Sequence, residues 1–145
     1  EFVWLYSDLD EMQPDVYSER ESIATLVQQG VITPLAGARE LGYEVSFDRL
    51  PIKDMGIPTR IDMARILDRI DHHIENGEPV YVHCLGGVGR TGTVIGCYLA
   101  RHGYASGYRI LHMIQQLRQN TVTHDRSAPE SSLQIDLVLS WVEGE

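Results

Sequence analysis

Apolar positions recur along this chain with two different spacings, and segments of the two kinds alternate. Short runs rich in β-branched and aromatic residues predict strands, at residues 2–6, 31–35, 43–52 and 80–82. Stripes with spacings of three and four predict helices, at residues 18–30, 59–76, 91–102, 107–119 and about 133–141. Strands alternating with helices favour an α/β fold, with a central, mostly parallel sheet of about four to five strands flanked by helices on both faces.

Size and composition narrow the class of protein further. The 145 residues contain no repeat and no linker, so we expect residues 1–145 to form one domain. No apolar run is long enough to span a membrane and no secretory signal opens the chain, so we expect a cytoplasmic protein without a membrane partner. The net charge of −9 argues against nucleic acid as a general partner.

The most informative stretch lies between the strand at 80–82 and the helix that follows it. Cys84 opens a loop with three glycines, and Arg90 closes the loop. A strand, a glycine loop and a helix N-terminus together aim backbone N–H groups at one centre, which is a binding site for a phosphate-sized anion. The guanidinium of Arg90 can hold two phosphate oxygens at once.

The two cysteines have different expected roles. Cys97 lies inside an apolar helical stripe and is expected in the core. Cys84 faces the helix N-terminus, which lowers a thiol's pKa, so we expect a thiolate nucleophile beneath the bound phosphate. The alternative, a buried structural cysteine beside an ordinary turn, explains neither Arg90 nor the glycines. A reactive thiol fits a reducing compartment.

The pattern His83-Cys84-x5-Arg90-Thr91 resembles the signature loop of the cysteine-dependent protein tyrosine phosphatases, and most closely their small dual-specificity-like branch. The resemblance implies a phosphatase-like fold and a single catalytic domain. It also implies that Thr91 donates its hydroxyl to the sulfur and that His83 tunes the cysteine from behind. The phosphate is then bound by Arg90 and by the loop backbone at Leu85, Gly86, Gly87, Val88 and Gly89.

Displacement of a phosphate ester by a thiolate also requires an acid that protonates the leaving oxygen. Asp54 lies in a loop punctuated by glycine and proline, residues 53–58, which resembles the acid loop of the small phosphatases. Its alternative role is that of a turn residue. Asp48 is the second candidate for the acid, although it lies within the alternating pattern of the strand at 43–52.

A late segment, residues 127–134, resembles the element that precedes a helix in many small phosphatases. In those enzymes a glutamine helps to position the hydrolytic water, so Gln134 is a candidate for this role. A solvated helix residue is an equal alternative.

Together these features predict a phosphomonoesterase that dephosphorylates phosphotyrosine, and also phosphoserine or phosphothreonine, in proteins through a phosphocysteine intermediate. No metal and no cofactor is expected. Alternatives left open are a phosphatase of small phosphorylated metabolites or of RNA 5′ phosphates, a catalytically weak phosphate-binding module, and other thiol chemistry such as arsenate reduction.

Overall fold

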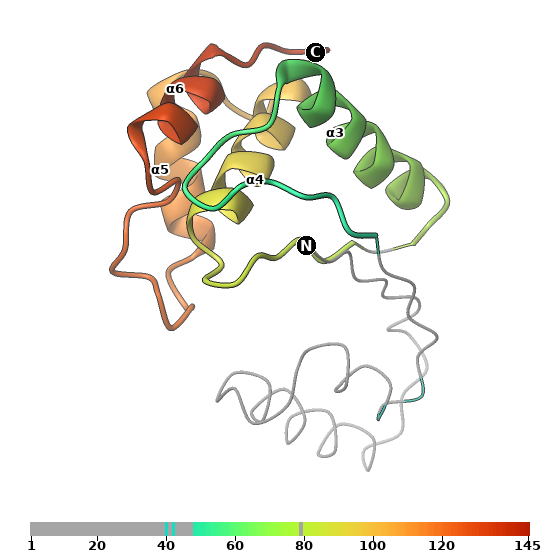
Figure 1. Cartoon of the computed structure of the whole chain (residues 1–145), viewed down its shortest axis with the longest axis horizontal. Coiled ribbons are helices and arrows are strands. Elements are labelled where there is room, and N and C mark those ends of the chain that lie inside the picture. Colours follow the sequence, from blue (N-terminus) through green and yellow to red (C-terminus); the bar gives the residue numbers. More distant parts are fainter. Residues whose placement is uncertain (1–39, 41, 43–47, 79) are drawn as a thin grey trace.

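The structure is a computed structural model, and it describes residues 40, 42, 48–78 and 80–145 (Figure 1). Within these residues the chain forms four helices: α3 (Arg60–Glu75), α4 (Gly89–Arg101), α5 (Tyr108–Leu117) and α6 (Ser132–Ser140). Helix α4 contacts each of the other three helices, and α5 also contacts α6. None of the described helices is long and apolar enough to cross a membrane.

The ends of the helices lie within about two residues of the positions that the sequence predicts. At the start of α3 the hydroxyl of Thr59 accepts a hydrogen bond from the backbone N–H of Asp62 at 3.1 Å, as the capping signal predicts. Helix α4 ends at Arg101, and Gly103 follows two residues later with a φ of +67°, in the left-handed region that favours glycine. Helix α4 begins at Gly89, two residues before the predicted start at Thr91.

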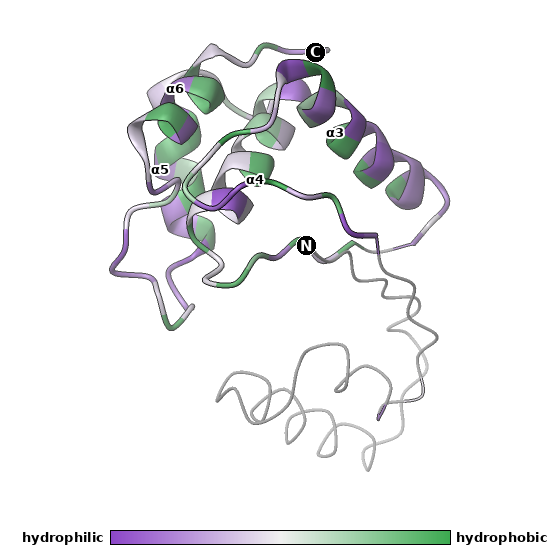
Figure 2. Ribbon diagram, in the orientation of Figure 1, coloured by the Kyte–Doolittle hydropathy of each residue, from purple (hydrophilic) through white to green (hydrophobic). Residues whose placement is uncertain are grey.

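The core lies where α4 meets its neighbours, and the apolar faces of the helices turn toward it (Figure 2). Cys97 is fully buried there, as predicted. Ile61 and Ile74 belong to the apolar stripe of α3 in the sequence but are exposed, whereas Met63 is fully buried. The core is formed by Met63, Ile66, Leu67, Ile70, Val88, Val94, Cys97, Leu99, Ala100, Ile110, Ile114, Ala128, Leu137, Val138 and Trp141.

The crossing of α4 and α6 depends on a small residue. A Cβ atom added at Gly96 would lie 2.7 Å from both Cγ atoms of Val138, closer than atoms in contact can approach. Glycine at this position therefore lets the two backbones pack closely, and the packing fixes α6 against the helix that follows the signature loop.

The predicted central sheet is wrong for the part of the chain that the structure describes. Those residues form helices and connecting segments, and neither 48–52 nor 80–82 forms a strand. Leu50, Ile52, Val80 and Val82 are partly buried and pack instead against the helical core. The helix predicted at 18–30 and the strands predicted at 2–6 and 31–35 lie outside the described residues.

Candidate active site

The segment from Cys84 to Val88 joins the extended residues 80–83 to the N-terminus of α4. Gly87 has a φ of +63°, which a residue with a Cβ rarely adopts. The turn at Gly87 brings loop amides close to the sulfur of Cys84, because the amides of Gly87 and Val88 hydrogen-bond to it. The sequence prediction that these residues form a loop before a helix is confirmed.

The side chain of Cys84 is buried, and its surroundings favour the thiolate. Burial opposes ionisation of the thiol, but hydrogen bonding from the Thr91 hydroxyl and from the amides of Thr91, Gly87 and Val88 outweighs it. As a result, the pKa of Cys84 is lowered. The Thr91 hydroxyl is buried and pairs with no nitrogen or oxygen of the described residues. The Thr91 hydroxyl is therefore available to stabilise negative charge on the sulfur.

Arg90 lies between the thiol and the loop that carries Asp54. Its Nη2 is 3.2 Å from Oδ1 of Asp54. Its Nη1 donates to the backbone oxygen of Ile52 at 3.5 Å. The side chain of Arg90 is largely buried, with 20% of its surface exposed, whereas Asp54 is 81% exposed. Two residues that the sequence places in different segments therefore meet at one site.

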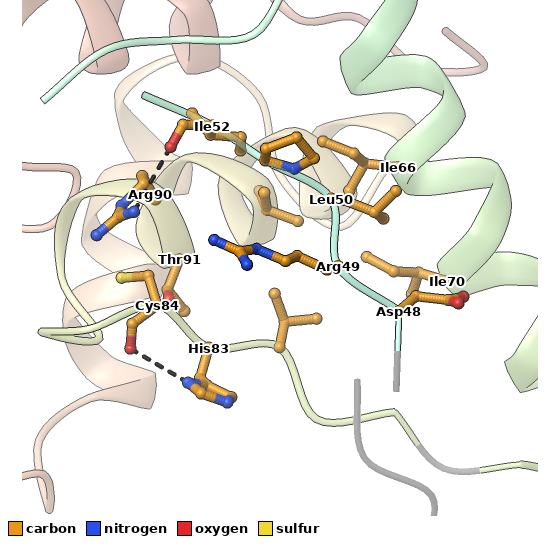
Figure 3. A pocket seen from close by; sticks show the side chains of 13 residues that line it. Asp48, Arg49, Leu50, Ile52, Ile66, Ile70, His83, Cys84, Arg90 and Thr91 are labelled. Atoms are coloured by element: carbon orange, nitrogen blue, oxygen red, sulfur yellow. Dashed lines mark hydrogen bonds between the residues drawn. The ribbon is translucent and has the colours of Figure 1, made fainter. Parts of the chain in front are cut away.

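A cavity of about 100 Å³ extends from Cys84 and Arg90 toward α3 (Figure 3). Residues 48–52 form one wall, and the side chain of Arg49 points into the cavity toward Arg90 and Cys84. Asp48, the second candidate for the acid, forms an ion pair with Arg69. The hydrogen bond from Arg69 outweighs burial and lowers the pKa of Asp48, which makes this carboxyl a poor proton donor.

His83 lies behind the loop. Its Nδ1 is 3.2 Å from the backbone oxygen of Cys84, and its ring packs against the ring of Tyr81 with centroids 5.4 Å apart. This contact with the Cys84 backbone fits the expected supporting role better than that of a base.

Gln134 is fully buried, so the alternative of a solvated helix residue is wrong. Its Oε1 accepts hydrogen bonds from the backbone N–H groups of Glu130 and Ser131, each at 3.1 Å. Its Nε2 donates to the backbone oxygen of Gly56, in the loop of Asp54, at 3.1 Å. Water positioning by Gln134 stays a prediction, while its described contacts link α6 to the acid loop.

Sequence reasoning missed four residues near the site, and one of them is Arg49 in the cavity wall. Ser131 caps α6, and the spacing Ser131-x-x-Gln134 is a capping box that could have been found in the sequence. Arg126 and Glu130 form an ion pair beside the signature loop. A Cβ at Gly86 would lie 3.9 Å from Nη1 of Arg126, but no sequence pattern signals that this cation lies beside the loop.

The described residues offer no evident metal centre. No group of three or more His, Cys, Asp and Glu side chains among them is arranged to hold a metal ion.

Residues 16–104, more than half of the chain, match a family model described as "Polymorphic toxin system, DSP-PTPase phosphatase". The chain belongs to this family, and so to the dual-specificity-like protein tyrosine phosphatases that the signature loop resembles.

Three curated relatives share shorter stretches with the chain. Two uncharacterized proteins of Methanocaldococcus jannaschii each align with 54 residues, or 37% of this chain. The first is 50% identical over a segment that makes up 37% of its own length, and the second is 46% identical over 34% of its length. A phosphatidylglycerophosphate phosphatase of Arabidopsis thaliana is 28% identical over 83 residues, which is 57% of this chain and 36% of the relative. The aligned segments thus span little more than a third of the length of these relatives.

Proposed function

We propose that residues 1–145 form a single catalytic domain that hydrolyses phosphate monoesters through a phosphocysteine intermediate, with phosphotyrosine in proteins as substrate. One observation carries the proposal: a buried thiol whose pKa is lowered by loop amides, next to an arginine that also contacts an exposed aspartate. Membership in a phosphatase family supports it.

In the first step the Cys84 thiolate attacks phosphorus, and the bond from phosphorus to the ester oxygen breaks. Arg90 and the amides of residues 85–89 bind the non-bridging oxygens and stabilise the charge that develops on them. The carboxylic acid of Asp54 gives its proton to the leaving oxygen. The contact between Asp54 and Arg90 supports this role, because it places the carboxyl beside the group that holds the phosphate.

In the second step a water molecule attacks phosphorus and the bond from phosphorus to sulfur breaks. Asp54, now ionised, accepts a proton from the water. The leaving group is the Cys84 thiolate, and the Thr91 hydroxyl stabilises it by the same interaction that lowers the pKa of Cys84 in the free enzyme. The products are inorganic phosphate and the regenerated thiolate.

The substrate class follows from the charges around the site. The net charge of −9 repels anions in general, so the substrate has to be attracted locally. Loop positions 85–89 carry no basic residue, and Arg126 beside the loop pairs with Glu130. The loop itself therefore favours a single phosphate monoester over a polyphosphorylated ligand, and Arg49 adds one cation from the adjoining cavity. Asp54 and Leu85, on the two loops that border the site, are both exposed. A site with such exposed borders is shallow enough to accept the short side chains of phosphoserine and phosphothreonine as well as phosphotyrosine.

A lipid phosphomonoester is the second candidate substrate. The Arabidopsis relative is named for phosphatidylglycerophosphate, a lipid substrate. Met55 and Leu133 are exposed apolar side chains near the contact between the acid loop and α6, and they suit an amphiphilic substrate.

Activity without added metal on a panel of substrates tests the proposal. The panel contains phosphotyrosine, phosphoserine and phosphothreonine peptides, a short-chain phosphatidylglycerophosphate, a small sugar phosphate and an RNA with a 5′ phosphate. The highest kcat/KM is expected for the phosphotyrosine peptide, and a preference for the lipid would favour the second candidate. Binding of phosphate without turnover of any substrate would show a binding module and overturn the proposal.

A further inference from the structure

The N-terminus of α6 is bonded to the loop that carries Asp54. The hydroxyl of Ser131 donates to the backbone oxygen of Met55 at 3.2 Å. The amide of Gln134 donates to the backbone oxygen of the next residue, Gly56, at 3.1 Å. Two successive carbonyl groups of the acid loop therefore receive hydrogen bonds from side chains more than 70 residues away in the sequence.

The two donors are themselves held in place. Ser131 and Gln134 form a capping box, in which the Ser131 hydroxyl accepts from the backbone N–H of Gln134 at 3.3 Å. Gln134 is fully buried, and a Cβ at Gly89 would lie 3.0 Å from its Oε1. The donors thus lie in a fixed position relative to Gly89, which immediately precedes Arg90.

The acid loop has little structure of its own. Its internal backbone hydrogen bond among the described residues runs from the N–H of Gly56 to the oxygen of Lys53, at 2.9 Å. Met55 has a φ of +58°, which is unfavourable for a side chain of this kind. A turn with such a strained residue needs outside contacts to persist, and the hydrogen bonds from Ser131 and Gln134 are such contacts.

We propose that Ser131 and Gln134 are positioning residues, which hold the loop of Met55 and Gly56 so that Asp54 faces Arg90 and the bound ester. This inference deepens the proposed function and depends on it. For Gln134 it assigns a role that does not require contact with the hydrolytic water, and for Ser131 it assigns a role beyond helix capping.

Variants of Ser131 can separate positioning from capping. Ser131→Asp keeps an oxygen that can cap α6 but removes the hydroxyl that donates to Met55. Ser131→Ala removes both interactions, and Ser131→Thr keeps both. A residue that acts through the acid matters most when the leaving group is poor, because a good leaving group departs without a proton.

The experiment measures kcat for phenyl phosphate, which has a poor leaving group, and for 2,4-dinitrophenyl phosphate, which has a good one. Ser131→Asp and Ser131→Ala are expected to lose about tenfold on phenyl phosphate, with little loss on the dinitrophenyl ester. Ser131→Thr is expected to behave like the wild type. In an Asp54→Asn background, Ser131→Asp is expected to cause no further loss, because the two residues act through one step.

The outcomes separate this inference from the proposed function. If the wild type hydrolyses neither ester, the proposed function fails. If the wild type is active but Ser131→Asp loses rate equally on both esters, or loses none, only the positioning role fails. The same conclusion follows if the effects of Ser131→Asp and Asp54→Asn multiply. Far-UV circular dichroism and the melting temperature of each variant check that its fold is retained.

Discussion

Oδ1 of Asp54 lies 3.2 Å from Nη2 of Arg90, although the two residues come from different segments of the chain. The carboxylate of Asp54 thus pairs with the same guanidinium that is proposed to bind the phosphate. A phosphate dianion competes with this carboxylate for Arg90, and protonation of Asp54 removes the competition. In the proposed mechanism, substrate binding is therefore coupled to the protonation state in which Asp54 acts as the acid.

This coupling predicts opposite effects of Asp54→Asn on catalysis and on binding. The kcat for phenyl phosphate is expected to fall by about 10² to 10⁴-fold, because the amide cannot donate the proton as an acid does. The affinity for orthovanadate, a phosphate analogue, is expected to stay the same or rise, since the competing charge is gone. Inhibition constants and single-substrate kinetics measure both quantities. An unchanged kcat would assign the acid to another residue, and Asp48→Asn serves as the matched control.

Replacement of the nucleophile gives the most direct test of the thiol. Cys84→Ser is expected to lower kcat for an aryl phosphate by about 10⁴-fold or more, because a serine hydroxyl is far less acidic than a thiol and stays protonated near neutral pH. Binding of inorganic phosphate, measured by calorimetry, is expected to persist because the loop amides and Arg90 remain. Cys97→Ser is the control and should retain activity. Undiminished turnover by Cys84→Ser would refute the assignment of the nucleophile.

The pH dependence of thiol alkylation tests the electrostatics of the site. The Thr91 hydroxyl contributes to the lowered pKa of Cys84, so Thr91→Val is expected to raise that pKa and to move the rate profile with iodoacetamide toward higher pH. Burial raises the pKa of Cys97 to about 12. This second thiol therefore stays protonated at the pH values of the experiment and does not contribute to the alkylation rate.

Thr93→Val provides the control for this measurement. The Thr93 hydroxyl donates to the backbone oxygen of Gly89 at 2.8 Å and has no described contact with the sulfur. Its loss is expected to leave the alkylation profile in place, although it can lower stability. A profile that moves equally in both variants would show that helix packing, not the Thr91 hydroxyl, sets the pKa of Cys84.

The close crossing of α4 and α6 gives a prediction about stability. Gly96→Ala places a methyl group against Val138, where the available distance is only 2.7 Å. The free energy of unfolding is expected to fall by about 1 to 3 kcal/mol, as measured by urea denaturation. Ser132→Ala, at the exposed start of α6, is the comparison and should change stability little. If Gly96→Ala left the free energy of unfolding unchanged, the two helices would be able to move apart without loss of stability.

The sequence predicts most of what is local at this site. The loop from Cys84 to Arg90, the helix that follows it and the turn at Asp54 all depend on contacts between near neighbours, which residue type and spacing reveal. The helix starting near Thr59 was predicted for the same reason, since a capping residue and a stripe of apolar positions mark it.

What the sequence did not predict depends on contacts between distant segments. The apolar runs at 43–52 and 80–82 predict strands, because a run that packs on a helical core has the same composition as a buried strand. The position of Arg126 beside Gly86 and the bonds from Ser131 to the acid loop join residues far apart in the chain. No periodic pattern within one segment carries that information.

Helix α4 contributes both to the candidate site, through Arg90 and Thr91, and to the core, through Cys97 and the close approach at Gly96. Because α4 serves both, a substitution in this helix that changes the reactivity of the site also lowers the stability of the fold. Few positions of α4 can therefore change during evolution. New substrate preferences can instead arise in the peripheral segments 53–58 and 119–127, which border the site and contribute none of the residues that form the core. In this architecture a lineage can diversify its targets while the reaction itself stays constant.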